Sequence, residues 1–164
     1  MAILKARFES PMGPIVAAAV GDAVTGLWFD GQRGFPAAAS EWSTARSSVL
    51  GRLGNWLEAY FAGDNPPVDF ELAADGTAFQ RRVWAQLRQI GYGQTDTYGA
   101  IAKRLAAPGQ AMAAQAVGQA VGRNPISIVI PCHRVVGANA KLTGYGGGLD
   151  RKEALLRLEG ALSA

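Results

Sequence analysis

The chain has 164 residues, of which 49% are hydrophobic and 18% are charged, so it is long enough for one or two compact domains and too apolar to be intrinsically disordered. Its 21 glycines and 8 prolines follow no period, which excludes collagen-like and repeat architectures. One cysteine and one histidine cannot make an internal disulfide or a Cys/His zinc site. We therefore expect a cytoplasmic protein with no metal and no membrane-spanning segment.

The net charge of +3 is divided unevenly along the chain. Residues 1–75 carry five Lys or Arg and nine Asp or Glu, a net charge of −4, whereas residues 76–164 carry eleven and four, a net charge of +7. A basic half joined to an acidic half favours contact between the basic half and a polyanion. The alternative is a chance distribution of solvated charge.

The first half predicts a small α+β unit. Apolar and β-branched runs between turn residues predict strands over residues 3–9, 15–20, 26–29 and 68–72, which form a small antiparallel sheet. Aromatic and aliphatic residues from Trp42 to Phe61 recur at spacings of three, four and seven, and they predict one amphipathic helix over 41–62. These aromatics are expected in the core.

A domain boundary is predicted between residues 75 and 76, so that the domains are 1–75 and 76–164. Thr77 and Gln80 fit a capping box that opens a helix ending at Gly91. Thr97 is predicted to cap a second helix over 98–105, and a third helix of small residues follows over 111–121.

These two short helices, 98–105 and 111–121, lie in the basic half and are typical of a helix-turn-helix. The alanine-rich helix lacks long side chains for the major groove, but its slim surface suits a narrower groove. A tightly packed core helix is the alternative.

The only cysteine and the only histidine are adjacent, at Cys132 and His133. They follow a short buried strand predicted over 126–130, and a last helix, capped by Asp150, is predicted to end near Glu159. A buried cysteine is usually an inert small hydrophobe. Adjacency to a histidine at a strand end favours a nucleophilic thiolate instead, with either a turn or a bridging water to connect the two side chains.

The hexapeptide Ile130-Pro131-Cys132-His133-Arg134-Val135 resembles the signature of the O6-alkylguanine-DNA alkyltransferases, also called methylated-DNA–protein-cysteine methyltransferases. Residues 76–160 resemble this family closely, and the acidic N-terminal unit resembles its bacterial members more loosely. The resemblance implies an α+β fold with a ribonuclease-H-like N-terminal domain and a mostly helical, winged-helix-like C-terminal domain. Further motifs at family spacing are Asn124-Pro125, Leu142-Thr143-Gly144-Tyr145, Arg151-Lys152-Glu153 and Leu158-Glu159-Gly160.

The family resemblance also implies a reaction. The protein is expected to bind double-stranded DNA through the minor groove as a monomer and to flip out an O6-alkylguanine, with O4-alkylthymine as a second candidate substrate. The alkyl group moves irreversibly to Cys132, so the protein acts once and needs no cofactor. Two alternatives are a non-catalytic sensor of alkylguanine and a helix-turn-helix regulator with an inert cysteine, and the complete motif around Cys132 argues against both.

Roles follow from the motifs that match. The resemblance implies that Cys132 is the nucleophile, His133 a base that acts through water, and Glu159 the carboxylate that orients it. Asn124 would brace the turn that carries the cysteine, and Tyr98 would donate a hydrogen bond to the flipped guanine. Arg134 is expected to be an ion-pair partner. The substrate contacts are expected from Tyr145, Gly146 and the Val135 carbonyl, and the DNA contacts from Thr97, Ala114, Gln115, Ala116, Gly118 and Arg123.

One position departs from the family pattern. Gln115 precedes Ala-Val-Gly where the family usually has an arginine that fills the space of the flipped base, and the stretch 110–114 is about three residues longer than usual for such a connection. An uncharged amide stacks less well than a guanidinium. We therefore expect weaker DNA binding and base flipping with unchanged transfer chemistry.

Overall fold

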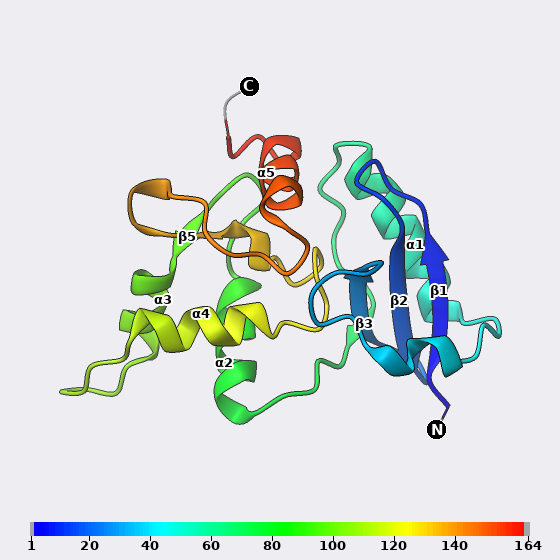
Figure 1. Cartoon of the computed structure of the whole chain (residues 1–164), viewed down its shortest axis with the longest axis horizontal. Coiled ribbons are helices and arrows are strands. Elements are labelled where there is room, and N and C mark those ends of the chain that lie inside the picture. Colours follow the sequence, from blue (N-terminus) through cyan, green and yellow to red (C-terminus); the bar gives the residue numbers. More distant parts are fainter. Residues whose placement is uncertain (1, 163–164) are drawn as a thin grey trace.

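The computed structural model describes residues 2–162 and has a sheet with α1 on one side of the molecule and most of the helices on the other (Figure 1). The strands are β1 (Leu4–Phe8), β2 (Ile15–Val20), β3 (Ala23–Phe29), β4 (Glu71–Leu72), β5 (Asp96–Thr97) and β6 (Val135–Val136). The helices are α1 (Ser48–Phe61), α2 (Ala78–Leu87), α3 (Tyr98–Leu105), α4 (Ala114–Gly122) and α5 (Leu149–Leu158), with 3₁₀ turns η1 (Ala37–Glu41), η2 (Cys132–Arg134) and η3 (Ala138–Ala140).

The N-terminal sheet has the order β1-β2-β3-β4 and is mixed rather than antiparallel. Neighbours β1, β2 and β3 are antiparallel, whereas β4 pairs in parallel with β3. The chain crosses over through α1 between β3 and β4, and such a crossover connection allows the two strands to run in the same direction. Of the strand predicted over 68–72, only the two residues of β4 are in a strand.

The predicted helix over 41–62 is wrong at its start. The helix α1 begins at Ser48, because the Ser47 hydroxyl accepts a hydrogen bond from the Leu50 N–H and caps it. Trp42 lies before this cap and packs against Trp28, with 5.9 Å between the ring centroids. Trp42 matched the helical spacing but meets its apolar partner in the sheet.

The second and third helices of the chain start where the sequence predicts. Thr77 and Gln80 form the capping box of α2 with bonds of 3.1 and 3.0 Å, although α2 ends at Leu87, short of the predicted Gly91. Thr97 caps α3 through a bond from the Ala100 N–H. The next helix, α4, begins three residues later than predicted, and its N-cap residue, Ala113, makes no side-chain capping bond.

Residues 126–130 are buried as predicted, but they form an irregular turn and not a strand. Only Ile126 forms an isolated bridge, to Leu27 of β3. Ile128 has a φ of 72°, which is unfavourable for a β-branched residue and reverses the chain direction. The last helix also differs in its cap: Gly148 is the capping residue of α5, and Asp150 lies within the first turn.

One continuous cluster of buried residues joins the two halves of the chain. It includes Leu27 and Phe29 of the sheet, Trp84 of α2 and Ile126 of the turn. The boundary at 75/76 and the likeness to ribonuclease H and winged-helix folds stay predictions. Within residues 2–162, no helix is both long and apolar enough to cross a membrane.

The capping box of α2 supports a stability prediction. Thr77→Ala removes the acceptor for the Gln80 N–H, so we expect the free energy of unfolding to fall by about 1 kcal/mol. Urea denaturation measures this difference. The control is Thr44→Ala in the exposed segment before α1, which should be neutral. Equal midpoints for the two variants would contradict a stabilising cap.

Candidate active site

Cys132 is the first residue of η2. It follows the turn at residues 126–130, in which Ile128 has a positive φ. Asn124 spans this turn, because its Nδ2 donates to the Ile130 carbonyl at 2.8 Å and its Oδ1 accepts from the Ile126 N–H at 3.0 Å. The Cys132 N–H also donates to the Ile130 carbonyl, at 2.8 Å. Asn124 is in the place expected of a residue that braces the turn, and it fixes the backbone that presents the cysteine.

His133 and Glu159 form a buried pair. Their side chains are 0% exposed, and His133 Nε2 lies 2.7 Å from Glu159 Oε2. The other ring nitrogen, His133 Nδ1, is buried and has no hydrogen-bond partner among residues 2–162. Because an ionised carboxylate only accepts, we assign the ring proton to Nε2, which leaves an acceptor lone pair on Nδ1.

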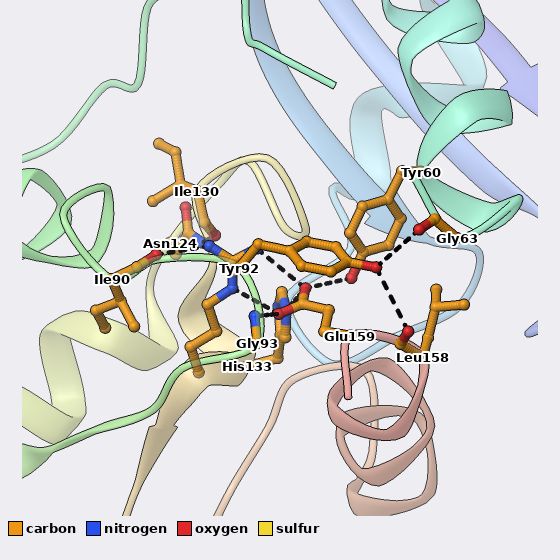
Figure 2. Close-up of polar contacts among 11 residues, drawn as sticks. Tyr60, Gly63, Ile90, Tyr92, Gly93, Asn124, Ile130, His133, Leu158 and Glu159 are labelled. Carbon is orange, nitrogen blue, oxygen red and sulfur yellow. Dashed lines mark hydrogen bonds and ion pairs between the residues drawn. The ribbon is translucent and has the colours of Figure 1, made fainter. Parts of the chain in front are cut away.

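The carboxylate of Glu159 is the centre of a larger hydrogen-bond network (Figure 2). Arg134 donates from Nε to Oε1 at 2.7 Å and from Nη2 to Oε2 at 3.1 Å, which agrees with its expected role as an ion-pair partner. Tyr60 donates to Oε2 at 2.5 Å, and the Gly93 N–H donates to Oε1 at 3.4 Å. Burial by itself raises the pKa of Glu159, but the bonds from His133, Arg134 and Tyr60 outweigh it and lower the pKa to about 2.

The thiol of Cys132 is held in its neutral form. Burial raises the pKa of Cys132, and the Asn124 side chain and the Lys152 ammonium lower it again by less. The pKa of His133 is lowered, mainly by burial, so the imidazole is neutral as well. At neutral pH the thiol therefore keeps its proton, and the imidazole has a free lone pair on Nδ1.

Lys152, which belongs to the motif Arg151-Lys152-Glu153, is a buried cation in the structure. Its Nζ donates to the carbonyls of Val135 at 2.6 Å and Thr143 at 2.7 Å, and burial lowers its pKa to about 8. The ammonium thus ties the residues after η2 to the glycine-rich loop 142–148. A signal existed in the sequence, because Lys152 lies three and four residues before the inward Leu155 and Leu156 on one face of α5.

The glycine-rich loop packs between the two halves of the protein. Tyr145 has a buried hydroxyl with no hydrogen-bond partner in the described chain, and burial raises its pKa. A Cβ on Gly147 would lie 2.7 Å from Tyr145 and 2.9 Å from Phe29, so only glycine fits there. Gly146 lies against the Gln32 side chain. Tyr98 at the start of α3 faces the same loop, where the Thr143 hydroxyl lies 3.5 Å from the Tyr98 hydroxyl.

The expected DNA contacts lie along α3 and α4. Thr97 is the cap of α3, Ala114 and Gln115 are exposed at the start of α4, Ala116 and Gly118 are half-buried, and Arg123 is exposed at its end. Gly118 packs against the Tyr98 ring, and Tyr98 in turn faces the glycine-rich loop 142–148. Their contact with DNA stays a prediction.

Tyr60 is the site residue that sequence reasoning missed. It was assigned to the apolar face of α1, and its ring is indeed buried. Its hydroxyl reaches Glu159, which is 99 residues away, and no local pattern signals such a contact. Among residues 2–162, no group of three or more His, Cys, Asp or Glu could hold a metal ion.

Comparisons with known proteins show which proteins this chain is similar to. A sequence family described as 6-O-methylguanine DNA methyltransferase, DNA binding domain, matches residues 78–161. A methylated-DNA–protein-cysteine methyltransferase of Mycobacterium tuberculosis is 48% identical over 151 residues, covering 92% of this chain and 88% of the relative. One from Methanosarcina acetivorans is 46% identical over 156 residues, covering 95% and 97%. The crystal structure of M. tuberculosis OGT in complex with DNA matches with a TM-score of 0.84 at 46% identity, covering 96% and 93%.

The low pKa of Glu159 leads to a prediction for acid stability. The pKa lies at about 2 in the folded protein against an ordinary 4.5, so this carboxylate stabilises the fold fully above pH 4.5 and loses that contribution as the pH falls toward 2. The loss should be about 3 kcal/mol. Glu159→Gln cannot titrate, so its free energy of unfolding should fall less over this interval, although the variant is less stable at neutral pH.

Denaturant titrations between about pH 5 and pH 2 measure this difference. Glu153→Gln is the matched control, because Glu153 pairs with Arg157 on the exposed face of α5. It should lose stability with the same pH slope as the wild type. A Glu159→Gln slope parallel to that of the wild type would contradict the assignment.

Proposed function

The chain belongs to the methylated-DNA–protein-cysteine methyltransferase family, and we propose that Cys132 is the residue that accepts the alkyl group. The protein acts in DNA repair by transferring an alkyl group from DNA to a cysteine. Cys132 is the only cysteine of the chain, and this observation carries the proposal. Its place beside the His133–Glu159 pair supports it.

The reaction is a displacement at a saturated carbon. His133 Nδ1 takes the thiol proton through a bridging water, and the Cys132 sulfur attacks the alkyl carbon. A bond between sulfur and carbon forms while the bond between that carbon and O6 of guanine breaks, and the electron pair stays with the purine. Tyr98 donates a proton to the departing guanine, which leaves neutral. The proton that His133 took from the thiol then replaces, through water, the one that Tyr98 gave. The thioether is stable to water, so each molecule acts once, without a cofactor.

The hydrogen-bond groups around Cys132 suit an O6-alkylated guanine. O4-alkylthymine is a second candidate substrate. The buried Tyr145 hydroxyl has no hydrogen-bond partner among residues 2–162, so it can donate to the alkylated oxygen, and the Gly146 N–H is the second expected donor. The Val135 carbonyl accepts from Lys152 through one lone pair and has a second for the exocyclic amine. An exocyclic amine and an O6 acceptor occur together on guanine.

The base must leave the duplex to reach a buried thiol. The small residues of α4 suit the minor groove, and the net charge of +7 over residues 76–164 suits the phosphates. We further propose that the protein works as a monomer in the cytoplasm. A lesion sensor would bind the same DNA without transfer, and the experiments below separate the two.

The first prediction concerns the acceptor. Incubation with duplex DNA containing O6-methylguanine should raise the intact mass of the protein by one methyl group, located on Cys132 by peptide mapping. Cys132→Ala should keep binding the DNA with no mass change. One equivalent of lesion should be consumed per protein under excess substrate. Consumption of more than one equivalent of lesion per protein, or transfer by Cys132→Ala, would contradict the proposal. Binding by the wild type without a mass change would indicate a lesion sensor.

The second prediction concerns Gln115. A guanidinium at this position would stack in the gap of the flipped base, so Gln115→Arg should increase transfer from duplex DNA severalfold. Transfer from free O6-benzylguanine, which needs no flipping, should not change. Gln119→Arg adds the same charge one turn further along the exposed face of α4 and controls for attraction to phosphates. An equal gain in both variants would exclude a wedge at position 115. If Gln115→Arg leaves the rate on duplex DNA unchanged, either another residue such as Arg123 or Arg104 acts as the wedge, or no wedge is needed.

A further inference from the structure

The N-terminal half reaches the Glu159 carboxylate through the hydroxyl of Tyr60. Tyr60 lies on α1 and is 1% exposed, and its hydroxyl donates to Glu159 Oε2 at 2.5 Å (Figure 2). Its ring stacks on Trp56 with 5.2 Å between centroids and meets the edges of Phe61 and Tyr92. These ring contacts fix the direction of the hydroxyl, so the bond to Glu159 is set by the packing of α1.

The acceptor of this bond is the oxygen that His133 also uses. Glu159 Oε2 receives Tyr60 at 2.5 Å, His133 Nε2 at 2.7 Å and Arg134 Nη2 at 3.1 Å. Each donor that shares an anionic oxygen reduces the negative charge that the others experience. The strength of the Glu159–His133 interaction therefore depends on Tyr60.

We propose that Tyr60 is a positioning residue for alkyl transfer: its hydroxyl fixes the Glu159 carboxylate and neutralises part of its charge, which keeps His133 neutral with a free Nδ1. This inference rests on the proposed function, in which His133 accepts the thiol proton. Without the hydrogen bond from Tyr60, the Glu159 carboxylate would carry more negative charge toward His133 and would favour the imidazolium. An imidazolium has no lone pair to accept the thiol proton. Too strong a carboxylate partner would thus disable the base at neutral pH.

The surroundings of the pair agree with this role. Burial lowers the pKa of His133, Glu159 raises it, and the positive charges of Arg134 and Lys152 lower it. Burial and the nearby Glu159 raise the pKa of Tyr60, so its hydroxyl stays protonated and always donates. The titratable and charged groups around the pair come from every adjoining element: Tyr60 from α1, Tyr92 from the segment after α2, Cys132 and Arg134 from η2, Tyr145 from the glycine-rich loop and Lys152 from α5.

The test is Tyr60→Phe in the full-length protein, which keeps the ring contacts and removes the hydroxyl. The pKa of His133 should rise by roughly half a unit to one unit. The acid limb of the rate of transfer from O6-benzylguanine should move upward by the same amount. Below that limb the rate should fall about threefold to tenfold, and above it the rates of variant and wild type should converge.

The matched control is Tyr92→Phe. Tyr92 contacts the Tyr60 ring, but its hydroxyl donates to the carbonyls of Gly63 and Leu158 and not to the carboxylate. This variant removes a hydroxyl from the same aromatic cluster and should leave the pKa of His133 unchanged. A pH-independent loss of rate, equal in Tyr60→Phe and Tyr92→Phe, would show a purely structural role and overturn the proposal.

His133 is the only histidine, so ¹⁵N NMR reads its protonation without ambiguity. In the wild type at neutral pH we expect a neutral ring with the proton on Nε2. An imidazolium, or a proton on Nδ1, would overturn the proposal whether or not Tyr60→Phe folds. If the wild type adds no alkyl group to Cys132, the proposed function fails, whereas transfer by the wild type with an unshifted His133 in Tyr60→Phe overturns only the role of Tyr60.

Discussion

The buried carboxylate of Glu159 must be satisfied by segments that lie far apart in the sequence. Taking an ionised carboxylate out of water costs several kcal/mol, and only charged and hydrogen-bonding partners offset that cost. The partners come from α1, from the segment after α2 and from η2, while Glu159 itself ends α5. The site is therefore complete only when both halves of the chain have folded against each other.

A second constraint follows from the position of the cysteine. A regular strand would place Cys132 and His133 on opposite faces, so the backbone must turn. The turn is made by the left-handed Ile128 and by η2, and Asn124 holds it from both ends. The bridge from Ile126 to Leu27 ties the same turn to the N-terminal sheet. Local strain in this segment is thus balanced by contacts that the rest of the fold provides.

The Cys132 thiol and the His133 imidazole are both neutral in the folded protein. Burial keeps the Cys132 thiol protonated, which protects a sole cysteine from unspecific chemistry. The imidazole of His133 is neutral for the same reason, and the ionised partner behind it is held by Arg134 and Tyr60. In the proposed reaction, transfer of the thiol proton from Cys132 to His133 creates the nucleophile.

The sequence by itself determined the α+β class and the helix caps at Thr77 and Thr97, because these depend on local propensity. The pairing of His133 with Glu159 followed from the family resemblance, because the two residues lie in motifs far apart in the sequence. Local spacing failed where a partner from elsewhere decided the outcome: Trp42 packs on Trp28 instead of extending α1, residues 126–130 turn instead of forming a strand, and β4 joins its sheet in parallel. Tyr60 became recognisable as a site residue only in the folded chain, and the contacts of Lys152 became visible only there. A hydroxyl and an ammonium look like ordinary core-flanking groups in a sequence, and only tertiary structure decides which carboxylate or carbonyl lies within hydrogen-bonding distance of them.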